Sequence, residues 1–182
     1  QPICIRSSSL LEDSHYQPFA GVYETVMIPN WGSEEVRLKE LSDAIRSVWA
    51  STYFRRAKEY LKATDYLLGD EKMAIIIQQV IGSEHGSYWY PNIGGVARSI
   101  NYYPPSGEKP EDGVGLLSFG FGKAVVESGS ALRFSPTHPK RPSQFLGGNQ
   151  SSGQERFYAL DLREGFMPRL DRLDNLKLVD LS

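Results

Sequence analysis

The stretch ICIRSSSLLED, residues 3–13, joins a short apolar run to an arginine, three serines and an acidic pair. The alternating run from Ile3 to Ile5 predicts a short buried strand. Arg6 is expected where that strand ends, beside hydroxyls and free backbone N–H groups, and its planar fork of donors suits phosphate. Glu12 and Asp13 are candidates for holding a metal ion or for orienting the arginine. The residue types alone also fit a strand followed by an ordinary solvated serine-rich turn.

The composition is that of an ordinary soluble globular protein. The chain has 182 residues, 40% of them apolar and 23% charged, which suffices for one domain or two small lobes. The net charge of −2 provides no bulk attraction to nucleic acid or anionic membranes, and no long apolar run or signal-peptide pattern predicts a membrane segment. The lone Cys4 lies in an apolar run and is expected in the core rather than as a nucleophile. A reducing cytoplasm is the simplest setting.

Two helices are predicted in the first third of the chain. Ser33 is a good N-cap, and Glu34 and Glu35 suit the positive end of a helix dipole. Helical apolar spacing then predicts a helix over about 34–51 and a second over about 53–62. Arg56 lies on a face of the second helix that is expected to be solvated.

Strands dominate the remainder. The uncharged β-branched run over residues 73–81 predicts a central strand buried on both faces. Gly82 to Gly86 is expected to turn the chain, and Pro104 to Gly113 to form a surface loop. Further strands are predicted at 88–90, 95–103, 114–118, 132–134 and 157–162. The segment 171–181 fits a short helix or an extended tail, and the mixture of elements points to an α+β or α/β domain.

Several separated motifs, in order, resemble the ATP-binding (PEP/pyruvate-binding) domain of phosphoenolpyruvate synthase and pyruvate phosphate dikinase. IRSSSLLEDS followed by PFAGVYET is similar to the family signature RSS…ED…FAG…ET. The similarity continues through SVWAS (47–51), Arg56-Ala57, AIIIQ (74–78), Gly95-Val96 and residues 120–126. It covers most of residues 3–136.

The resemblance implies an α+β, ATP-grasp-like fold with a mixed β-sheet and flanking helices. It also implies ATP and Mg²⁺ as ligands, and transfer of phosphate from ATP to a histidine on a separate domain of the same longer chain. Pyruvate is then the expected final acceptor, with no nucleic-acid or membrane partner and a cytoplasmic setting.

The boundaries suggest part of a longer protein. The chain begins inside a predicted strand without an initiator methionine, and the family's first lobe, with its own phosphate-binding lysine, lies upstream of the RSS motif. We therefore expect residues 1–182 to be a fragment of one ATP-grasp nucleotide-binding domain and the isolated fragment to be inactive. Residues 3–136 match the family, 137–153 are expected to form an exposed, poorly ordered loop, and 154–182 a C-terminal strand and tail.

Candidate site residues follow from the same motifs. The resemblance implies that Arg6 contacts the ATP phosphates and that Gln78 lies at the nucleotide, although a strand-end glutamine also fits a solvent-facing position. Arg133 is a further candidate phosphate contact. Gly120 and Gly122 flank one residue, so backbone N–H groups there can approach a phosphate. We expect the side chains of Arg6, Gln78 and Arg133 to converge on one face.

One position departs from the family pattern. Where the family usually has GLGE, with the glutamate near metal and phosphates, this chain has Lys123. A lysine can neutralise phosphate directly but cannot ligate Mg²⁺. Arg6 and Lys123 are therefore the expected catalytic cations. We expect Lys123 to lie on the same face as Arg6. Glu127, or Glu111 with Asp112, is then the expected source of a metal-binding carboxylate, unless the metal site is incomplete.

Two alternatives remain open. Lys123 also fits a non-catalytic nucleotide-binding or interaction module descended from the same family. An aromatic set in predicted strands fits base stacking in an unrelated oligonucleotide-binding domain, although such residues are more often core; it comprises Tyr88, Trp89, Tyr90, Tyr102 and Tyr103. The three histidines, at 15, 85 and 138, lack metal-ligand spacing and are assigned no role.

Overall fold

The computed structural model describes residues 1–9, 12, 21–63, 69, 71–123, 125, 131–140, 156–163, 165 and 176–180. They belong to two compact units: unit 1 comprises residues 1–81 and 160–176, and unit 2 comprises 82–159 and 177–182. The helices over residues 34–50 and 55–62 lie in unit 1, and the described part of unit 2 is built mainly of strands. The chain is therefore of the α+β class, as predicted.

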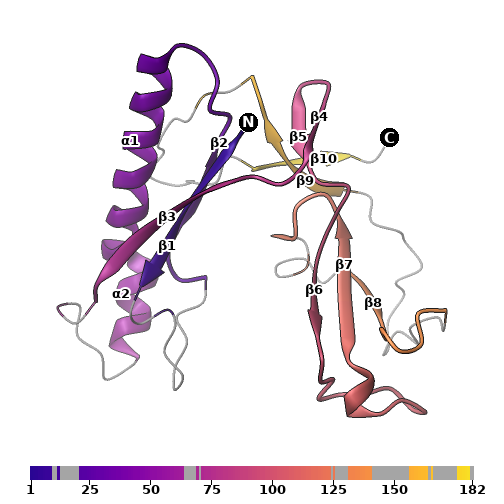
Figure 1. Cartoon of the computed structure of the whole chain (residues 1–182). Coiled ribbons are helices and arrows are strands. Elements are labelled where there is room, and N and C mark those ends of the chain that lie inside the picture. The colour runs from indigo at the N-terminus through magenta and orange to yellow at the C-terminus, as the bar shows by residue number, and fades with distance from the viewer. Residues whose placement is uncertain are drawn as a thin grey trace. The chain divides into compact units, whose positions relative to one another are not determined.

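Unit 1 is a three-stranded antiparallel sheet packed against a helix. The strand order is β2-β1-β3, with β1 Ile3–Ser9, β2 Thr25–Ile28 and β3 Met73–Gln79. Figure 1 shows helix α1, Glu34–Ala50, running alongside this sheet. The core between them contains five residues with no exposed surface: Ile5, Val26, Ile28, Ala44 and Val48. The apolar alternation in β1 and β2 therefore buries one sheet face against α1.

Helix α1 begins as predicted. The Ser33 Oγ accepts a hydrogen bond from the backbone N–H of Val36 at 3.4 Å, and Glu34 and Glu35 occupy the first turn. One of the N–H groups left unpaired at a helix start is thus satisfied by the cap.

Replacing this cap gives a first testable effect. We expect Ser33→Ala to lower the free energy of unfolding by about 1 kcal/mol, because one helix N–H loses its acceptor. Urea denaturation followed by helical circular dichroism would measure it, with exposed Ser106→Ala in unit 2 as the control. Equal midpoints for Ser33→Ala and the wild type would show that Ser33 does not stabilise the helix.

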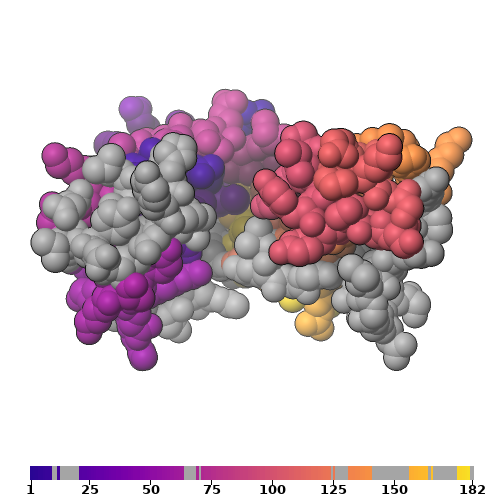
Figure 2. All heavy atoms as spheres, turned by 90° about the horizontal axis from the view of Figure 1, so that it is seen from below, coloured from indigo at the N-terminus to yellow at the C-terminus, as the bar shows by residue number. Residues whose placement is uncertain are grey.

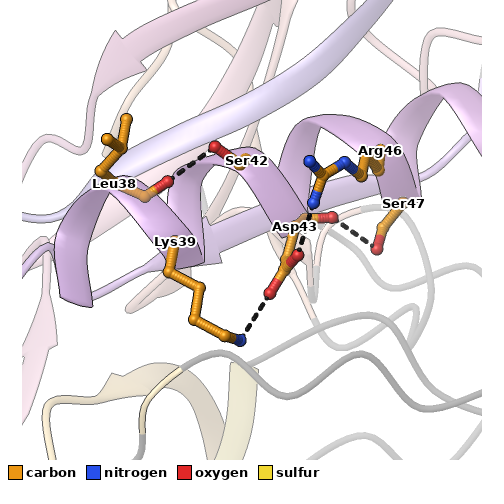
Figure 3. A network of polar contacts seen from close by, with 6 residues as sticks. All are labelled: Leu38, Lys39, Ser42, Asp43, Arg46 and Ser47. Atoms are coloured by element: carbon orange, nitrogen blue, oxygen red, sulfur yellow. Dashed lines mark hydrogen bonds and ion pairs between the residues drawn. The ribbon is translucent and has the colours of Figure 1, made fainter. Parts of the chain in front are cut away.

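The outer face of α1 carries a polar network (Figure 3). Asp43 accepts hydrogen bonds from Lys39 at 2.9 Å and from Arg46 at 3.0 Å. The bond from Lys39 holds the pKa of the Asp43 carboxyl below its usual value. Ser42 and Ser47 each donate to a backbone carbonyl one turn earlier. All of these contacts lie within one helix, so the network is a solvated helix surface rather than a binding site.

The second predicted helix starts later than expected. A short 3₁₀ turn, η1 (Ser51–Tyr53), follows α1, and Phe54 is extended at φ −70° and ψ 160°. Helix α2 therefore spans Arg55–Lys62, where Ala57 and Leu61 are buried. Arg56 is exposed, in agreement with a solvated face.

The expected end of β1 was wrong. The strand continues to Ser9, so Arg6 lies in its middle rather than at its end. The backbone of the serines pairs with β3 instead of being free, in the register Ser7↔Ile75 and Ser9↔Met73. The hydroxyls of Ser7 and Ser9 also have partners, since Ser7 Oγ donates to Glu12 Oε1 at 3.0 Å and Ser9 Oγ accepts from the Glu12 N–H at 3.1 Å. A strand can therefore continue through three polar residues.

The prediction of a central, doubly buried strand at 73–81 was also wrong. Among the described residues β3 pairs only with β1, at the edge of the sheet. Met73 and Ile75 pack on the core, whereas Ile76 and Ile77 are 41% and 49% exposed. β-Branched residues favour a strand, but burial depends on what packs against it.

In unit 2 the segment predicted as a turn at 82–86 forms part of a hairpin. Strands β4 (Ser83–His85) and β5 (Tyr88–Tyr90) are antiparallel, and Gly86 takes φ +61° between them. This hairpin joins β9 (Arg156–Asp161) and β10 (Leu176–Asp180) in a sheet of order β10-β9-β5-β4. The strand predicted at 157–162 is confirmed as β9, and within the predicted segment 171–181 residues 176–180 form a strand rather than a helix.

The second sheet of unit 2 is antiparallel with order β6-β7-β8. Its strands are Ile93–Arg98, Val114–Phe119 and Leu132–Phe134, and the 3₁₀ turn η3, Pro110–Asp112, precedes β7. The strands predicted at 114–118 and 132–134 are confirmed. The one predicted at 95–103 ends at Arg98, because residues 99–103 enter the loop between β6 and β7.

Aromatic residues form part of the interior of unit 2. Phe157 is 4% exposed, and its ring centroid lies 4.7 Å from that of Tyr90 and 4.9 Å from that of Phe119, both edge-on. Tyr90 therefore serves packing, which removes one residue from the proposed base-stacking set.

None of the helices in the described part of the chain is long and apolar enough to cross a membrane.

Candidate functional site

The two-glycine turn after β7 is held tightly by its neighbours. Gly120 has φ +72°, a conformation that favours glycine, and the Phe121 N–H donates to the Tyr158 carbonyl at 3.1 Å. A Cβ atom on Gly94 would lie 2.7 Å from both the Gly120 oxygen and the Gly122 nitrogen. The start of β6 therefore approaches this turn so closely that only glycine fits at position 94.

Lys123 follows this turn in the same unit. Its side chain is partly buried, and Nζ lies 5.0 Å from the centroid of the Tyr158 ring. An ammonium at that distance is attracted by the ring face. Lys123 thus packs on the Tyr158 ring, directly after the Gly120–Gly122 turn in sequence.

A cavity of about 390 Å³ lies on one face of the β6-β7-β8 sheet. That volume is within the range of about 300–1,000 Å³ that is usual for small-molecule sites. Apolar residues of β6 and β7 contribute Val96, Val114 and Leu116, and the polar lining comprises Arg98, Asn101 and Arg133. Arg133, a predicted phosphate contact, therefore lines a cavity whose volume is in the range of small-molecule sites.

The Arg133 guanidinium is fixed by the loop that follows β6. Its Nη2 donates to the Asn101 Oδ1 at 2.8 Å and to the Tyr103 carbonyl at 3.0 Å. The Asn101 Oδ1 also accepts from the Tyr103 N–H at 3.2 Å, and the Asn101 N–H donates to the Pro110 carbonyl at 2.8 Å. Asn101 is only 4% exposed, so the arginine is held by a buried side chain.

Sequence reasoning missed Arg98 and Asn101. The alternation of β6 was a usable signal for Arg98, because Val96 and Arg98 are two residues apart and share a sheet face. For Asn101 no local signal was present, since its partner Arg133 lies 32 positions away in the sequence.

Two tyrosines at this cavity are strongly exposed. Tyr102 is 73% and Tyr103 80% exposed, and both belong to the loop between β6 and β7. Figure 2 shows this loop, in red, as a continuous part of the surface. The cavity thus combines an apolar floor, two guanidinium groups and accessible aromatic rings.

In unit 1, Arg6 and Gln78 lie on the same face of the sheet. The register pairs Arg6 with Ile76 and Cys4 with Gln78, which makes Arg6 and Gln78 diagonal neighbours across β1 and β3. Both side chains are exposed, whereas the opposite face packs against α1. The face carrying Arg6 and Gln78 therefore offers a guanidinium beside an amide.

Cys4 lies on that face but is 5% exposed. Burial raises the pKa of its thiol, with a smaller opposing effect of Arg6. A thiol with a raised pKa is a poor nucleophile at neutral pH, which agrees with the core role that the sequence predicted.

A buried polar cluster closes the end of β1. The Tyr23 hydroxyl donates to Glu71 Oε2. Burial is the largest cause of the raised pKa of the Tyr23 phenol, and this hydrogen bond is the second. Glu12 Oε2 and Glu71 Oε1 are buried without a hydrogen-bond partner among the described residues. The Glu12 carboxylate, one candidate for holding a metal or orienting Arg6, accepts from Ser7, and its backbone N–H donates to Ser9.

The predicted Mg²⁺ ligands are not brought together in the described residues. No group of three or more acidic, histidine or cysteine side chains forms there. Glu111 is exposed, and Asp112 accepts a hydrogen bond from the Lys109 N–H at 2.8 Å. Glu127 and Asp13 lie outside the described residues, as do positions 141–153 of the predicted loop.

The candidate residues divide between the two units. Arg6 and Gln78 belong to unit 1, and Gly120, Gly122, Lys123 and Arg133 belong to unit 2. Their convergence around one ligand stays a prediction.

Comparison with known proteins agrees with the motifs. A family model described as the pyruvate phosphate dikinase AMP/ATP-binding domain matches residues 1–167. Over 124 residues, 68% of this chain, the sequence is 32% identical to the uncharacterized phosphotransferase YvkC of Bacillus subtilis (strain 168). The matched region spans 13% of the length of that relative.

Proposed function

Because the chain belongs to the AMP/ATP-binding domain family of pyruvate phosphate dikinase, we propose that it holds ATP for a phosphotransferase that passes phosphate to a histidine on a separate domain. The chain itself is an ATP-binding, phosphotransferase-like domain. We further propose that it is part of a longer enzyme that resembles phosphoenolpyruvate synthase and that it has an ATP-grasp fold. Pyruvate is the proposed final acceptor, and the proposed setting is the cytoplasm.

The observation that carries the proposal is the position of Arg6. By its resemblance to the family signature, Arg6 is proposed to contact the phosphates, and it lies in the middle of a strand that is paired on both sides. Phosphoryl transfer depends mainly on positioning and on stabilising negative charge. A guanidinium on a rigid strand meets that need better than one on a loop. Gln78, on the same face, is proposed to contact the nucleotide.

The other proposed contacts come from unit 2. Arg133 and Lys123 supply positive charge, and the Gly120–Gly122 turn supplies backbone approach to a phosphate. Mg²⁺ would neutralise phosphate charge, and Glu127 is the carboxylate proposed to hold it. Since the described residues do not assemble a metal site, no step is assigned to the ion.

One observation favours a second candidate function. Lys123 replaces the family glutamate and packs on the Tyr158 ring, which fits a non-catalytic nucleotide-binding or interaction module of the same descent. A protein of that kind would bind ATP without forming a phosphorylated intermediate, so phosphorylation distinguishes the two functions.

The test uses the full-length protein with ATP labelled at the β and γ phosphates. We expect acid-labile, base-stable label on the protein, as phosphohistidine requires. Arg6→Gln should weaken ATP binding about tenfold, by the loss of one charge-assisted hydrogen bond, and should abolish labelling. Arg56→Gln, an exposed arginine of α2, is the matched control.

Three results would count against the proposal. Failure of the wild-type protein to bind ATP would reject the nucleotide site altogether. Binding without labelling would favour the non-catalytic module. Equal ATP affinity of Arg6→Gln and Arg56→Gln would show that Arg6 does not contact the nucleotide.

A further inference from the structure

Two guanidinium groups share the cavity of unit 2. The register pairs Val96 with Leu116 and Leu116 with Arg133, so these three residues form one row across the sheet. Arg98, paired with Val114, stands in the adjacent row of the same face. Neighbouring strands are about 4.8 Å apart and successive rows on one face about 6.8 Å, so the backbones that carry the two arginines are separated by about 12 Å. Both side chains line the cavity between them.

The positive charge of this cavity is not neutralised by the residues that line it. The described lining contains no aspartate or glutamate. The two hydrogen bonds of Arg133 go to neutral oxygens, those of the Asn101 amide and the Tyr103 carbonyl. Within the described residues, no ion pair involves Arg98 or Arg133. Two unpaired cations above an apolar floor attract an anion strongly.

The remaining geometry selects the kind of anion. Both bonds of Arg133 use Nη2, which leaves the Nε and Nη1 hydrogens for a ligand. An anion with several oxygens distributed along a chain offers acceptors to both arginines at once. The exposed rings of Tyr102 and Tyr103 offer contact surface to an organic group attached to that anion.

We propose that this cavity binds the polyphosphate chain of the nucleotide, with Arg98 and Arg133 as contacts and Asn101 as the positioning residue of Arg133. The inference rests on the proposed function and extends it to two residues outside the family motifs. Asn101 acts through Arg133, since one buried oxygen holds both the guanidinium and the loop backbone.

Calorimetric titration of the full-length protein with ATP and with inorganic tripolyphosphate tests the contacts. Arg98→Gln should weaken both ligands about tenfold, because each loses one charge-assisted contact. Arg156→Gln removes the same charge from an exposed ion pair with Asp180 in the same unit and should leave both affinities unchanged. Adenosine, which lacks phosphate, should not respond to Arg98→Gln.

A double-mutant cycle tests the positioning role of Asn101. Asn101→Ala should weaken tripolyphosphate binding about tenfold in the wild-type background and have no further effect on top of Arg133→Gln. A purely structural role would give a similar loss in both backgrounds. Melting temperatures identify any variant that fails to fold. If Asn101→Ala or Arg133→Gln does not fold, Arg98→Gln still tests the inference, because Arg98 is exposed and its replacement is expected to leave the fold intact.

The outcomes separate the two proposals. Absence of ATP binding by the wild-type protein would overturn the proposed function and this inference with it. Normal ATP and tripolyphosphate affinity of Arg98→Gln and Arg133→Gln, alongside weakened binding by Arg6→Gln, would overturn this inference and the proposed Arg133 contact, while the ATP site at Arg6 would stand. A loss of ATP affinity in Arg98→Gln without a loss for tripolyphosphate would also overturn it, since the contact would then be to another part of the nucleotide.

Discussion

Lys123→Glu in the full-length protein is expected to lower ATP affinity in the absence of Mg²⁺ by about tenfold to a hundredfold. A lysine beside the triphosphate neutralises part of its charge, and charge-assisted hydrogen bonds of this kind contribute about 1.5–3 kcal/mol. The glutamate restores the acid that the family usually has, so ATP binding should become more dependent on Mg²⁺ and phosphoryl transfer should rise if the site is otherwise intact. Titration of ATP with and without Mg²⁺ measures both effects.

Lys123→Met is the matched control for this substitution. It removes the charge and the contact of Nζ with the Tyr158 ring, 5.0 Å from the ring centroid, without adding a carboxylate. We expect a smaller loss of ATP affinity without Mg²⁺ and no gain in Mg²⁺ dependence. If Lys123→Glu leaves the affinity unchanged under both conditions, Lys123 does not face the nucleotide and the Gly120–Lys123 segment is not part of the site.

Gly94→Ala is expected to lower the free energy of unfolding of unit 2 by about 3 kcal/mol, at the upper end of the usual cost of overpacking. The new Cβ would lie 2.7 Å from the Gly120 oxygen and the Gly122 nitrogen. Both are backbone atoms, so the whole turn has to move to relieve the contact. Urea unfolding followed by near-ultraviolet circular dichroism would measure the loss.

Gly122→Ala is the steric control in the same turn. The nearest atom to its added Cβ, the Gly95 nitrogen, is 3.8 Å away, so we expect a change within about 0.5 kcal/mol. The ATP affinity of Gly122→Ala tests the proposed phosphate contact of the Gly120–Gly122 turn, because a methyl group at Gly122 would hinder close approach of a phosphate to the backbone. Equal stability of Gly94→Ala and the wild type would mean that the turn does not pack against β6 as described.

Local signals were sufficient for several elements. Ser33 followed by an acidic first turn and helical apolar spacing located α1, and short β-branched or aromatic runs located β5, β7, β8 and β9. These signals act within about one helical turn or a few strand residues, so they do not depend on which distant segment becomes the neighbour. No local signal predicted that position 94 must be glycine, because the steric constraint comes from the turn at Gly120, 26 residues later in the sequence.

The sequence by itself determined the family, through ordered motifs, and identified Arg6, Gln78, Lys123 and Arg133 as residues to examine. Only the tertiary structure decided that β1 continues through its serines, because Glu12 bonds to the hydroxyls of Ser7 and Ser9 and the serine backbone pairs with β3. Only the tertiary structure, likewise, joined Arg133 to Asn101 and placed Arg98 on the same sheet face. Strand pairing and hydrogen bonds between distant residues depend on which segments meet, and no local pattern of residue types encodes that choice.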